Sequence, residues 1–144
     1  MKIQSLGHVV IKVRDQKRAE AFYNGLLGMP IAARLPSFSM TFFTLGNHHD
    51  FAIKAVGDSA PDAPEDSPGL FHVAFKIGSH IDELREAKLY LEATGLKVDA
   101  YDHEVAKSIY FNDPDGNMIE LYIDASDVWK QRPEAVAQGA PFNL

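Results

Sequence analysis

The chain has 144 residues, of which 46% are hydrophobic, so it can bury one core but is too short for two ordinary domains. Its net charge of −6, without a Lys/Arg cluster, argues against a nucleic-acid partner or an anionic membrane partner. The chain has no cysteine, which excludes disulfides, a thiolate nucleophile and thiolate ligands, so any bound metal would use nitrogen and oxygen donors.

The first half of the chain begins with a strand-prone run, followed by a helix and further strands. Dense β-branched content at 5–13 favours a strand. Asp15 is a suitable N-cap, and a helix beginning there would end at Gly28. The residues at 40–45 and 51–56 are again strand-prone and are separated by turn residues.

The second half repeats this order after a segment at 58–69 that is rich in Pro, Asp, Glu and Ser, a composition typical of a linker. A strand is predicted over 70–77, and a helix beginning at Ser79 or Asp82 would end near Gly95. Shorter strand-prone runs follow at 97–101, 108–111 and 118–123.

The second half therefore predicts the order β-α-β-β-β, and the internal repeat implies the same order for the first half, in which two of the three later strands are visible. We expect an α+β fold, with two tandem βαβββ modules in a single domain over 1–144. The expected parts are module one at about 1–57, module two at about 70–124 and a C-terminal tail at about 125–144.

Two histidines occupy the same place in the two halves. His8 lies within Leu-Gly-His-Val-Val-Ile-Lys-Val at 6–13, and His72 lies within Leu-Phe-His-Val-Ala-Phe-Lys-Ile at 70–77. Because successive side chains of a strand point to opposite faces, each histidine points away from the apolar row of its strand. The apolar rows can then pack under helices, which leaves both imidazoles facing a cavity.

The run Ser-Ile-Tyr-Phe-Asn-Asp-Pro-Asp-Gly-Asn-Met-Ile-Glu-Leu at 108–121 resembles the closing turn and ligand strand of the vicinal oxygen chelate superfamily. That superfamily includes glyoxalase I, fosfomycin-resistance proteins, bleomycin-binding proteins and type I extradiol dioxygenases. Together with the repeat, the resemblance covers residues 3–124. It implies paired βαβββ modules whose mixed sheet curls around a central metal cavity.

The resemblance also implies a metal centre, because His8, His72 and Glu120 match the ligand positions of the family. Two histidines and a carboxylate, with coordination positions left open, form the arrangement of non-haem Fe(II) oxygenases. The expected metal is Fe(II), with Mn(II) or Zn(II) as alternatives. Each residue taken alone is more often a surface or core residue than a ligand, but their combination with the repeat favours a metal site.

Three further residues resemble the groups that surround the metal in extradiol dioxygenases, namely His49, His103 and Tyr110. A catechol must lose protons and dioxygen must gain one, and histidines that titrate near neutral pH suit both transfers. A tyrosine hydroxyl can orient a substrate oxygen. The alternatives are that the two histidines are polar loop residues and that the tyrosine is a core aromatic.

The internal repeat leaves the role of His49 open. Aligning Asn47 with Asn117 places Asp50, not His49, at the position of Glu120. Strict alternation then sends His49 to the opposite face, unless a bulge turns it inward. Asp50 would otherwise be a fourth oxygen ligand.

The resemblance implies an Fe(II)-dependent extradiol ring-cleaving dioxygenase that acts on a catechol-type substrate and dioxygen. Phe51, Phe111 and Tyr122 are expected to line part of its pocket. Glyoxalase I relatives carry a fourth ligand, a Glu in the last strand of the first module, which has no clear counterpart in this chain. The alternatives are a metal-dependent transferase or hydrolase of the fosfomycin-resistance type, with Lys12, Lys54 and Lys76 as candidate cations, and a metal-free drug-binding protein.

We expect a cytoplasmic protein, because no apolar run approaches the roughly 20 residues that span a bilayer and no basic and apolar leader is present. Relatives are commonly dimers, and exposed sheet edges need protection. The expected partners are therefore the small-molecule substrate, dioxygen and a second copy of the chain, without nucleic acid or membrane.

Overall fold

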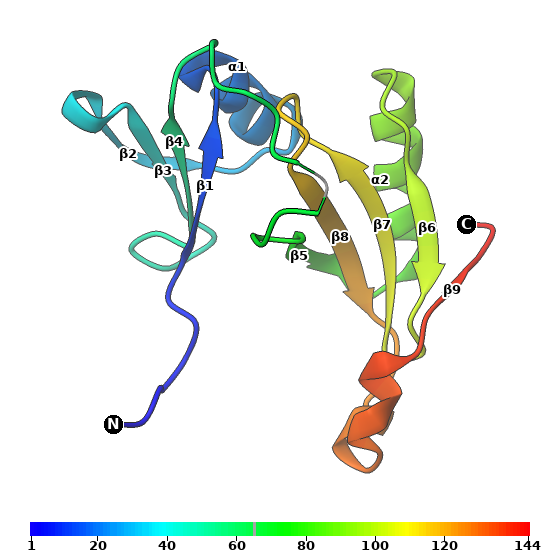
Figure 1. The fold of residues 1–144 in the computed structure, drawn as a ribbon. Coiled ribbons are helices and arrows are strands. Elements are labelled where there is room, and N and C mark those ends of the chain that lie inside the picture. The colour runs from blue at the N-terminus through cyan, green and yellow to red at the C-terminus, as the bar shows by residue number, and fades with distance from the viewer. Residues whose placement is uncertain (65) are drawn as a thin grey trace. The chain divides into compact units, whose positions relative to one another are not determined.

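The computed structural model describes residues 1–64 and 66–144, and the chain divides into two compact units, 1–67 and 68–144. Each unit contains one mixed sheet and one main helical segment in the order β-α-β-β-β (Figure 1). This confirms the α+β class and the duplication expected from the sequence.

The first unit is a four-stranded sheet in the order β1-β4-β3-β2, in which β1 and β4 are parallel and the other pairs are antiparallel. Its helical segment continues from α1 into a wider π-helical turn. The elements are β1 Val9–Val13, α1 Gln16–Glu20, the π turn Ala21–Leu26, β2 Ile31–Leu35, a 3₁₀ turn Pro36–Phe38, β3 Met40–Phe43 and β4 Phe51–Ala55.

Local chemistry sets the ends of this helical segment. The side chain of Asp15 accepts a hydrogen bond from the N–H of Arg18 at 2.6 Å, which confirms the expected N-cap. At the other end Gly28 has a φ of +72°, a left-handed conformation in which glycine stops a helix. The helix packs on an aromatic core in which the rings of Tyr23 and Phe51 lie 4.9 Å apart.

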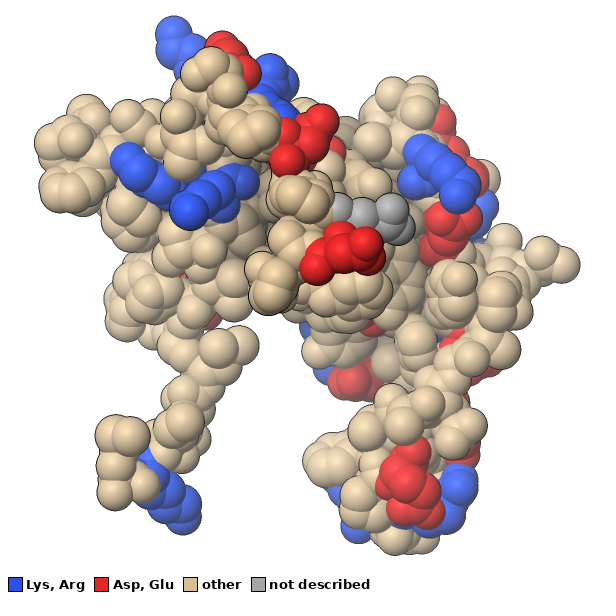
Figure 2. Space-filling view, viewed as in Figure 1, with Lys and Arg blue, Asp and Glu red and all other residues tan. Residues whose placement is uncertain are grey.

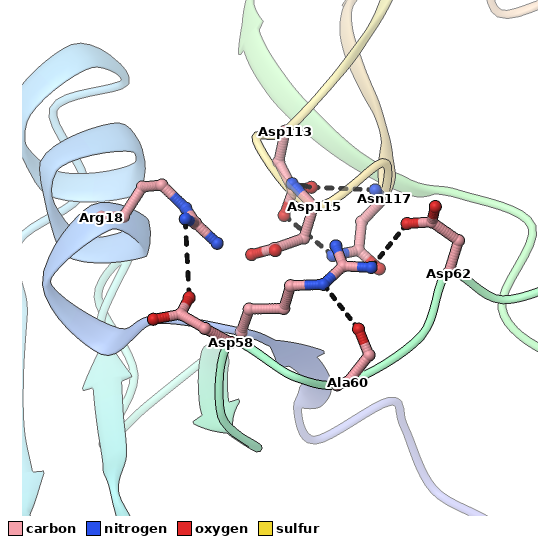
Figure 3. Close-up of polar contacts among 8 residues, drawn as sticks. Arg18, Asp58, Ala60, Asp62, Asp113, Asp115 and Asn117 are labelled. Atoms are coloured by element: carbon pink, nitrogen blue, oxygen red, sulfur yellow. Dashed lines mark hydrogen bonds and ion pairs between the residues drawn. The ribbon is translucent and has the colours of Figure 1, made fainter.

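The first residues of the segment expected to be a linker, 58–62, contact the first unit. The Arg14 side chain donates to the carbonyl of Ala60 at 2.8 Å and pairs with Asp62 at 2.5 Å. Arg18 forms an ion pair with Asp58, drawn as a dashed line in Figure 3, with 3.7 Å between the charged atoms. Residues 58–62 therefore pack against the end of β1 and the start of α1.

The second unit is a five-stranded sheet in the order β5-β8-β7-β6-β9, with β5 and β8 parallel. Its fifth strand comes from the C-terminal tail. The elements are β5 Val73–Gly78, α2 Ile81–Ala93, β6 Asp99–Asp102, β7 Ala106–Asn112, β8 Met118–Asp124, the 3₁₀ turns Val128–Lys130 and Pro133–Ala137, and β9 Ala140–Pro141.

The start of α2 differs from both predicted caps. The N-cap is His80, and the Glu83 carboxylate accepts hydrogen bonds from the N–H groups of Ser79 and His80 at 2.9 and 2.8 Å. A Cβ on Gly78 would lie 2.0 Å from this carboxylate, so a larger residue there would displace the capping side chain. Ser79 and Asp82 were wrong candidates because a carboxylate reaching back from the first turn satisfies the same N–H groups.

The turn between β7 and β8 is organised by one buried acid. Asp113 accepts hydrogen bonds from the N–H groups of Asp115 and Asn117 at 2.9 and 2.8 Å, and from the Asn117 amide at 2.8 Å (Figure 3). These bonds close the loop of the quoted motif and bring Met118 into register with Asn112 at the start of β8.

The predicted strand boundaries differ most from the observed ones where the pairing between strands ends. The strands predicted over 5–13 and 70–77 begin at Val9 and Val73, because their pairing with β4 and β8 starts there. Strands β2 and β9 were not predicted: Ile31–Leu35 is mostly exposed and Ala-rich, and β9 is only two residues long.

Charged side chains of both signs are interspersed on the face drawn in Figure 2. Several form ion pairs, such as Arg85 with Asp82 at 2.7 Å and Lys88 with Glu92 at 2.6 Å on α2. Among the residues described, none of the helices has the length and apolarity needed to cross a membrane.

Candidate active site

His72 and Glu120 form the centre of the candidate site in the second unit. The parallel register of β5 and β8 pairs Ala74 with Glu120, which places the glutamate beside the entry to β5. The His72 Nε2 atom lies 3.0 Å from one Glu120 carboxylate oxygen, and the Ser108 hydroxyl donates to the other at 2.5 Å. Glu120 is only 8% exposed, so this carboxylate is held in a nearly dry position.

This pair of donors fits adjacent ligands of one metal ion. Two ligand atoms each about 2.1 Å from an ion and about 90° apart are separated by about 3 Å. The Nδ1 atom of His72 is buried and has no hydrogen-bond partner among the described residues. An unpaired buried ring nitrogen costs free energy, and such costs call for a functional explanation.

Tyr110 and His103 lie next to this pair. Tyr110 is paired with Glu120 across β7 and β8, and its ring lies 5.7 Å from that of His72. Its hydroxyl is 2.9 Å from Nε2 of His103. Burial, and then the negative charge of Glu120, raise the pKa of Tyr110 to about 12, so its hydroxyl is protonated at neutral pH.

The predicted residues of the first unit form a second cluster. The rings of His8 and His49 lie 4.2 Å apart, and His49 is 5.3 Å from the ring of Phe42. Nδ1 of His48 lies 2.7 Å from Nδ1 of His49. Partial desolvation lowers the pKa of His49, and the neighbouring His8 and His48 lower it further, which favours its neutral form.

Asp50 is occupied within the loop before β4. One of its carboxylate oxygens accepts hydrogen bonds from the N–H groups of Leu45 and Asn47, at 2.6 and 3.3 Å. The carboxylate therefore closes this loop, while His49 turns toward His8. Strict alternation fails here because β4 begins only at Phe51.

The sheet registers correct the alignment of Asn47 with Asn117. Val9 pairs with Phe51 and Val73 pairs with Ile119, so superposing the two histidine strands aligns Ala52 with Glu120. The alignment on asparagine is therefore wrong by two residues.

The same superposition aligns a second pair of residues. Phe42 pairs with Ala52, as Tyr110 pairs with Glu120. The first unit thus carries an alanine and a phenylalanine where the second unit carries the carboxylate and the phenol.

The structure brings together part of the predicted set in each unit. His72, Glu120, Tyr110 and His103 are neighbours in the second unit, whereas His8 lies with His49 in the first. Within either unit, the described residues include no group of three or more His, Cys, Asp or Glu that could hold a metal ion. The complete triad therefore remains a prediction.

Two residues expected to line a pocket do not do so. Phe51 is fully buried beside Tyr23, and Phe111 is 3% exposed. Both belong to the apolar rows under the helices. For Phe111 this follows from alternation along β7, which places it on the face opposite Tyr110. Tyr122 is half-buried and, because it follows Glu120 by two residues on β8, it lies on the same face of the sheet as Glu120.

Sequence reasoning missed Ser108, although a signal was available. Ser108 and Tyr110 are two residues apart on β7 and therefore share the face that meets Glu120. A second missed contact joins Nδ1 of His103 to the backbone carbonyl of Gln138, at 2.9 Å. A backbone acceptor contributed by the tail carries no residue-type signal.

Comparison with known proteins supports the fold and the family. The chain is 31% identical over 123 residues to biphenyl-2,3-diol 1,2-dioxygenase 3 of Rhodococcus globerulus and 29% identical over 120 residues to catechol-2,3-dioxygenase of Bacillus subtilis. Each match covers 83% of this chain, but only 63% and 41% of the two dioxygenases. It is also 25% identical to glutathione transferase FosA of Serratia marcescens, over 84% of this chain and 82% of that protein.

Solved structures show the same fold. A glyoxalase family protein from Enterococcus faecalis superposes with a TM-score of 0.65 at 27% identity, over 85% of this chain and 99% of that one. The fosfomycin resistance protein FosX from Listeria monocytogenes gives 0.66 at 23% identity, over 86% and 94%. A family model described as Glyoxalase/Bleomycin resistance protein/Dioxygenase superfamily matches residues 5–121. The chain therefore belongs to this superfamily, as the residues at 108–121 indicated.

Proposed function

We propose that the protein is an Fe(II)-dependent extradiol dioxygenase that opens the ring of a catechol-type substrate with dioxygen. One observation carries the proposal: a hydrogen-bonded Tyr110–His103 pair lies beside the His72–Glu120 pair. This arrangement sets a protonated phenol and an imidazole next to two metal-type ligands. The similarity to two named ring-cleaving dioxygenases supports the same reaction class.

His8, His72 and Glu120 would hold the iron. The bound ion would supply open coordination positions and a path for electrons between diol and dioxygen. Ala52 leaves no carboxylate at the position in the first unit that corresponds to Glu120, so we infer three protein ligands. The glyoxalase type, with four, is less well supported.

The surrounding residues would handle protons and orientation. Ser108 donates to one oxygen of Glu120, which directs the other oxygen toward His72. The Tyr110 hydroxyl, protonated at neutral pH, donates its one proton to Nε2 of His103, and its oxygen can accept a hydrogen bond from a substrate hydroxyl and so orient it. His49, whose lowered pKa favours the neutral ring, can accept a proton from a substrate hydroxyl at Nε2.

Oxygen consumption tests this proposal. Protein purified without oxygen and supplied with Fe(II) should consume dioxygen with catechol and contain stoichiometric iron. His72→Ala and Glu120→Ala should lose both iron and activity. His80→Ala, which changes an exposed histidine at the start of α2, is the matched control and should retain both. If iron and oxygen uptake survive in the His72 and Glu120 variants, the assignment is wrong.

A metal-dependent transferase of the fosfomycin-resistance type is the second candidate. The similarity to glutathione transferase FosA of Serratia marcescens, at 25% identity over 121 residues, supports it. The candidate cations argue the other way, since Lys76 is paired with Asp124 and Lys54 contacts the carbonyl of Phe38. Consumption of fosfomycin with Mn(II) and glutathione, without oxygen uptake on catechol, would establish this second function instead.

A further inference from the structure

Both ring nitrogens of His103 have defined partners, and one of them comes from the C-terminal tail. Nδ1 lies 2.9 Å from the carbonyl oxygen of Gln138, and Nε2 lies 2.9 Å from the hydroxyl of Tyr110. A carbonyl oxygen can only accept, so Nδ1 carries the proton. In the neutral ring Nε2 is then an acceptor, and the Tyr110 hydroxyl donates to it.

The tail that supplies this carbonyl is anchored to the sheet. Strand β9 pairs with β6 through Tyr101 with Pro141 and Asp102 with Ala140, and it lies along β6 in Figure 1. The N–H of Phe142 donates to the carbonyl of Ala100 at 3.1 Å. These contacts hold the carbonyl at the edge of the sheet, beside the hairpin that carries His103.

Gly139 permits the close approach of the tail to the imidazole. A Cβ at this position would lie 2.8 Å from Nδ1 and 3.0 Å from Cε1 of His103. The ring also lies nearly parallel to that of Tyr101, with centroids 6.1 Å apart and an angle of 16° between the planes. A side chain at Gly139 would therefore displace either the ring or the Gln138 carbonyl.

We propose that the tail segment 138–142 is a positioning element that holds His103 in the Nδ1-protonated form, with Nε2 directed at the Tyr110 hydroxyl. Without this carbonyl, the ring is free to carry its proton on Nε2 and to compete with Tyr110 as a donor. The consequence for catalysis rests on the proposed dioxygenase function. The consequence for the tautomer does not.

Nuclear magnetic resonance of protein labelled with ¹⁵N-histidine tests the proposal directly. Long-range ¹H–¹⁵N spectra identify which ring nitrogen carries the proton, and the His103 signals are assigned with a His103→Ala variant. The full chain, metal-free and loaded with Zn(II), should show the Nδ1-protonated form. Gly139→Ala should shift His103 to the Nε2-protonated form or to an exchange average of the two.

A control glycine variant and a second variant of the tail complete the test. Gly69→Ala adds a Cβ that meets nothing within 4 Å and should leave the His103 signals unchanged. If Gly139→Ala does not fold, Phe142→Pro, which removes the N–H that bonds to Ala100, should loosen the contact between Gln138 and His103. An Nε2-protonated His103 in the unmodified chain overturns the proposal, as does an unchanged ring in the tail variants.

Oxygen uptake then separates the two proposals. If the dioxygenase proposal holds, Gly139→Ala should lower kcat for catechol at least several-fold and change the pH profile, with KM less affected. Absence of activity in the unmodified protein would count against the dioxygenase alone, since the tautomer is read independently of turnover.

Discussion

Removal of the Ser108 hydroxyl should weaken both metal binding and the stability of the fold. Ser108 is fully buried, and its hydroxyl donates to one oxygen of Glu120 at 2.5 Å. Groups that orient a metal ligand typically contribute 10- to 100-fold in affinity, about 1.4 to 2.7 kcal/mol. Loss of a buried hydrogen bond to a charged group costs about 1.5 to 3 kcal/mol of folding stability.

The two effects can be measured separately in Ser108→Ala. Competition with a chelator gives the Zn(II) or Fe(II) affinity without oxygen, and urea unfolding of the metal-free protein gives the free energy of unfolding. We expect affinity to fall at least 10-fold, because an unanchored carboxylate must be ordered again on binding. Ser59→Ala, at an exposed turn position, is the control and should change neither quantity.

The result that would refute this reasoning is specific. If Ser108→Ala unfolds more easily but binds metal with unchanged affinity, Ser108 only supports the core, and the orientation of Glu120 does not matter for binding. If both quantities are unchanged, the hydrogen bond makes no net contribution in solution.

Three other predictions concern stability. Hydrogen bonding from Arg34 lowers the pKa of Glu20 below its ordinary 4.5, so the ionised carboxylate stabilises the fold fully above pH 4.5 and this stabilisation is lost as the pH falls through the lower pKa of the folded state. Urea unfolding between pH 7 and 3 should therefore show the stability of the unmodified protein falling to that of Glu20→Gln. Gly78→Ala should displace the Glu83 cap and cost about 1 kcal/mol in thermal unfolding, and Glu83→Ala should add little further. Asp113→Ala should cost about 2 to 3 kcal/mol in urea unfolding because it leaves N–H groups of the turn without their acceptor, whereas a cost below about 0.5 kcal/mol would contradict the turn's assigned role.

Local signals in the sequence were sufficient for several features of the fold. The helix between Asp15 and Gly28 was predicted from a capping side chain and a left-handed glycine, both of which act within a few residues. The turn at 113–117 and the strand after it were predicted for the same reason. Alternation of apolar residues also placed Ile11 and Val13 in the core.

The sequence was less informative wherever pairing between distant segments decides the outcome. Strand β2 is mostly exposed, so its residues lack the apolar alternation by which strands are recognised. The equivalence of Ala52 and Glu120 depends on backbone register, and the shared Gly-Asn dipeptide at 46–47 and 116–117 indicated another alignment. The position of His49 depends on a loop closed by the carboxylate of Asp50.

The sequence by itself determined the duplication, the βαβββ order of the second half, the family and the residue types of the candidate site, because periodicity, caps and the motif at 108–121 are encoded locally. Only the tertiary structure decided that Ser108 anchors Glu120 and that the tail meets His103 through the Gln138 carbonyl. Such contacts join backbone and side-chain atoms across strands. Their geometry follows from sheet register, which depends on the packing of the whole unit rather than on any short run of residues.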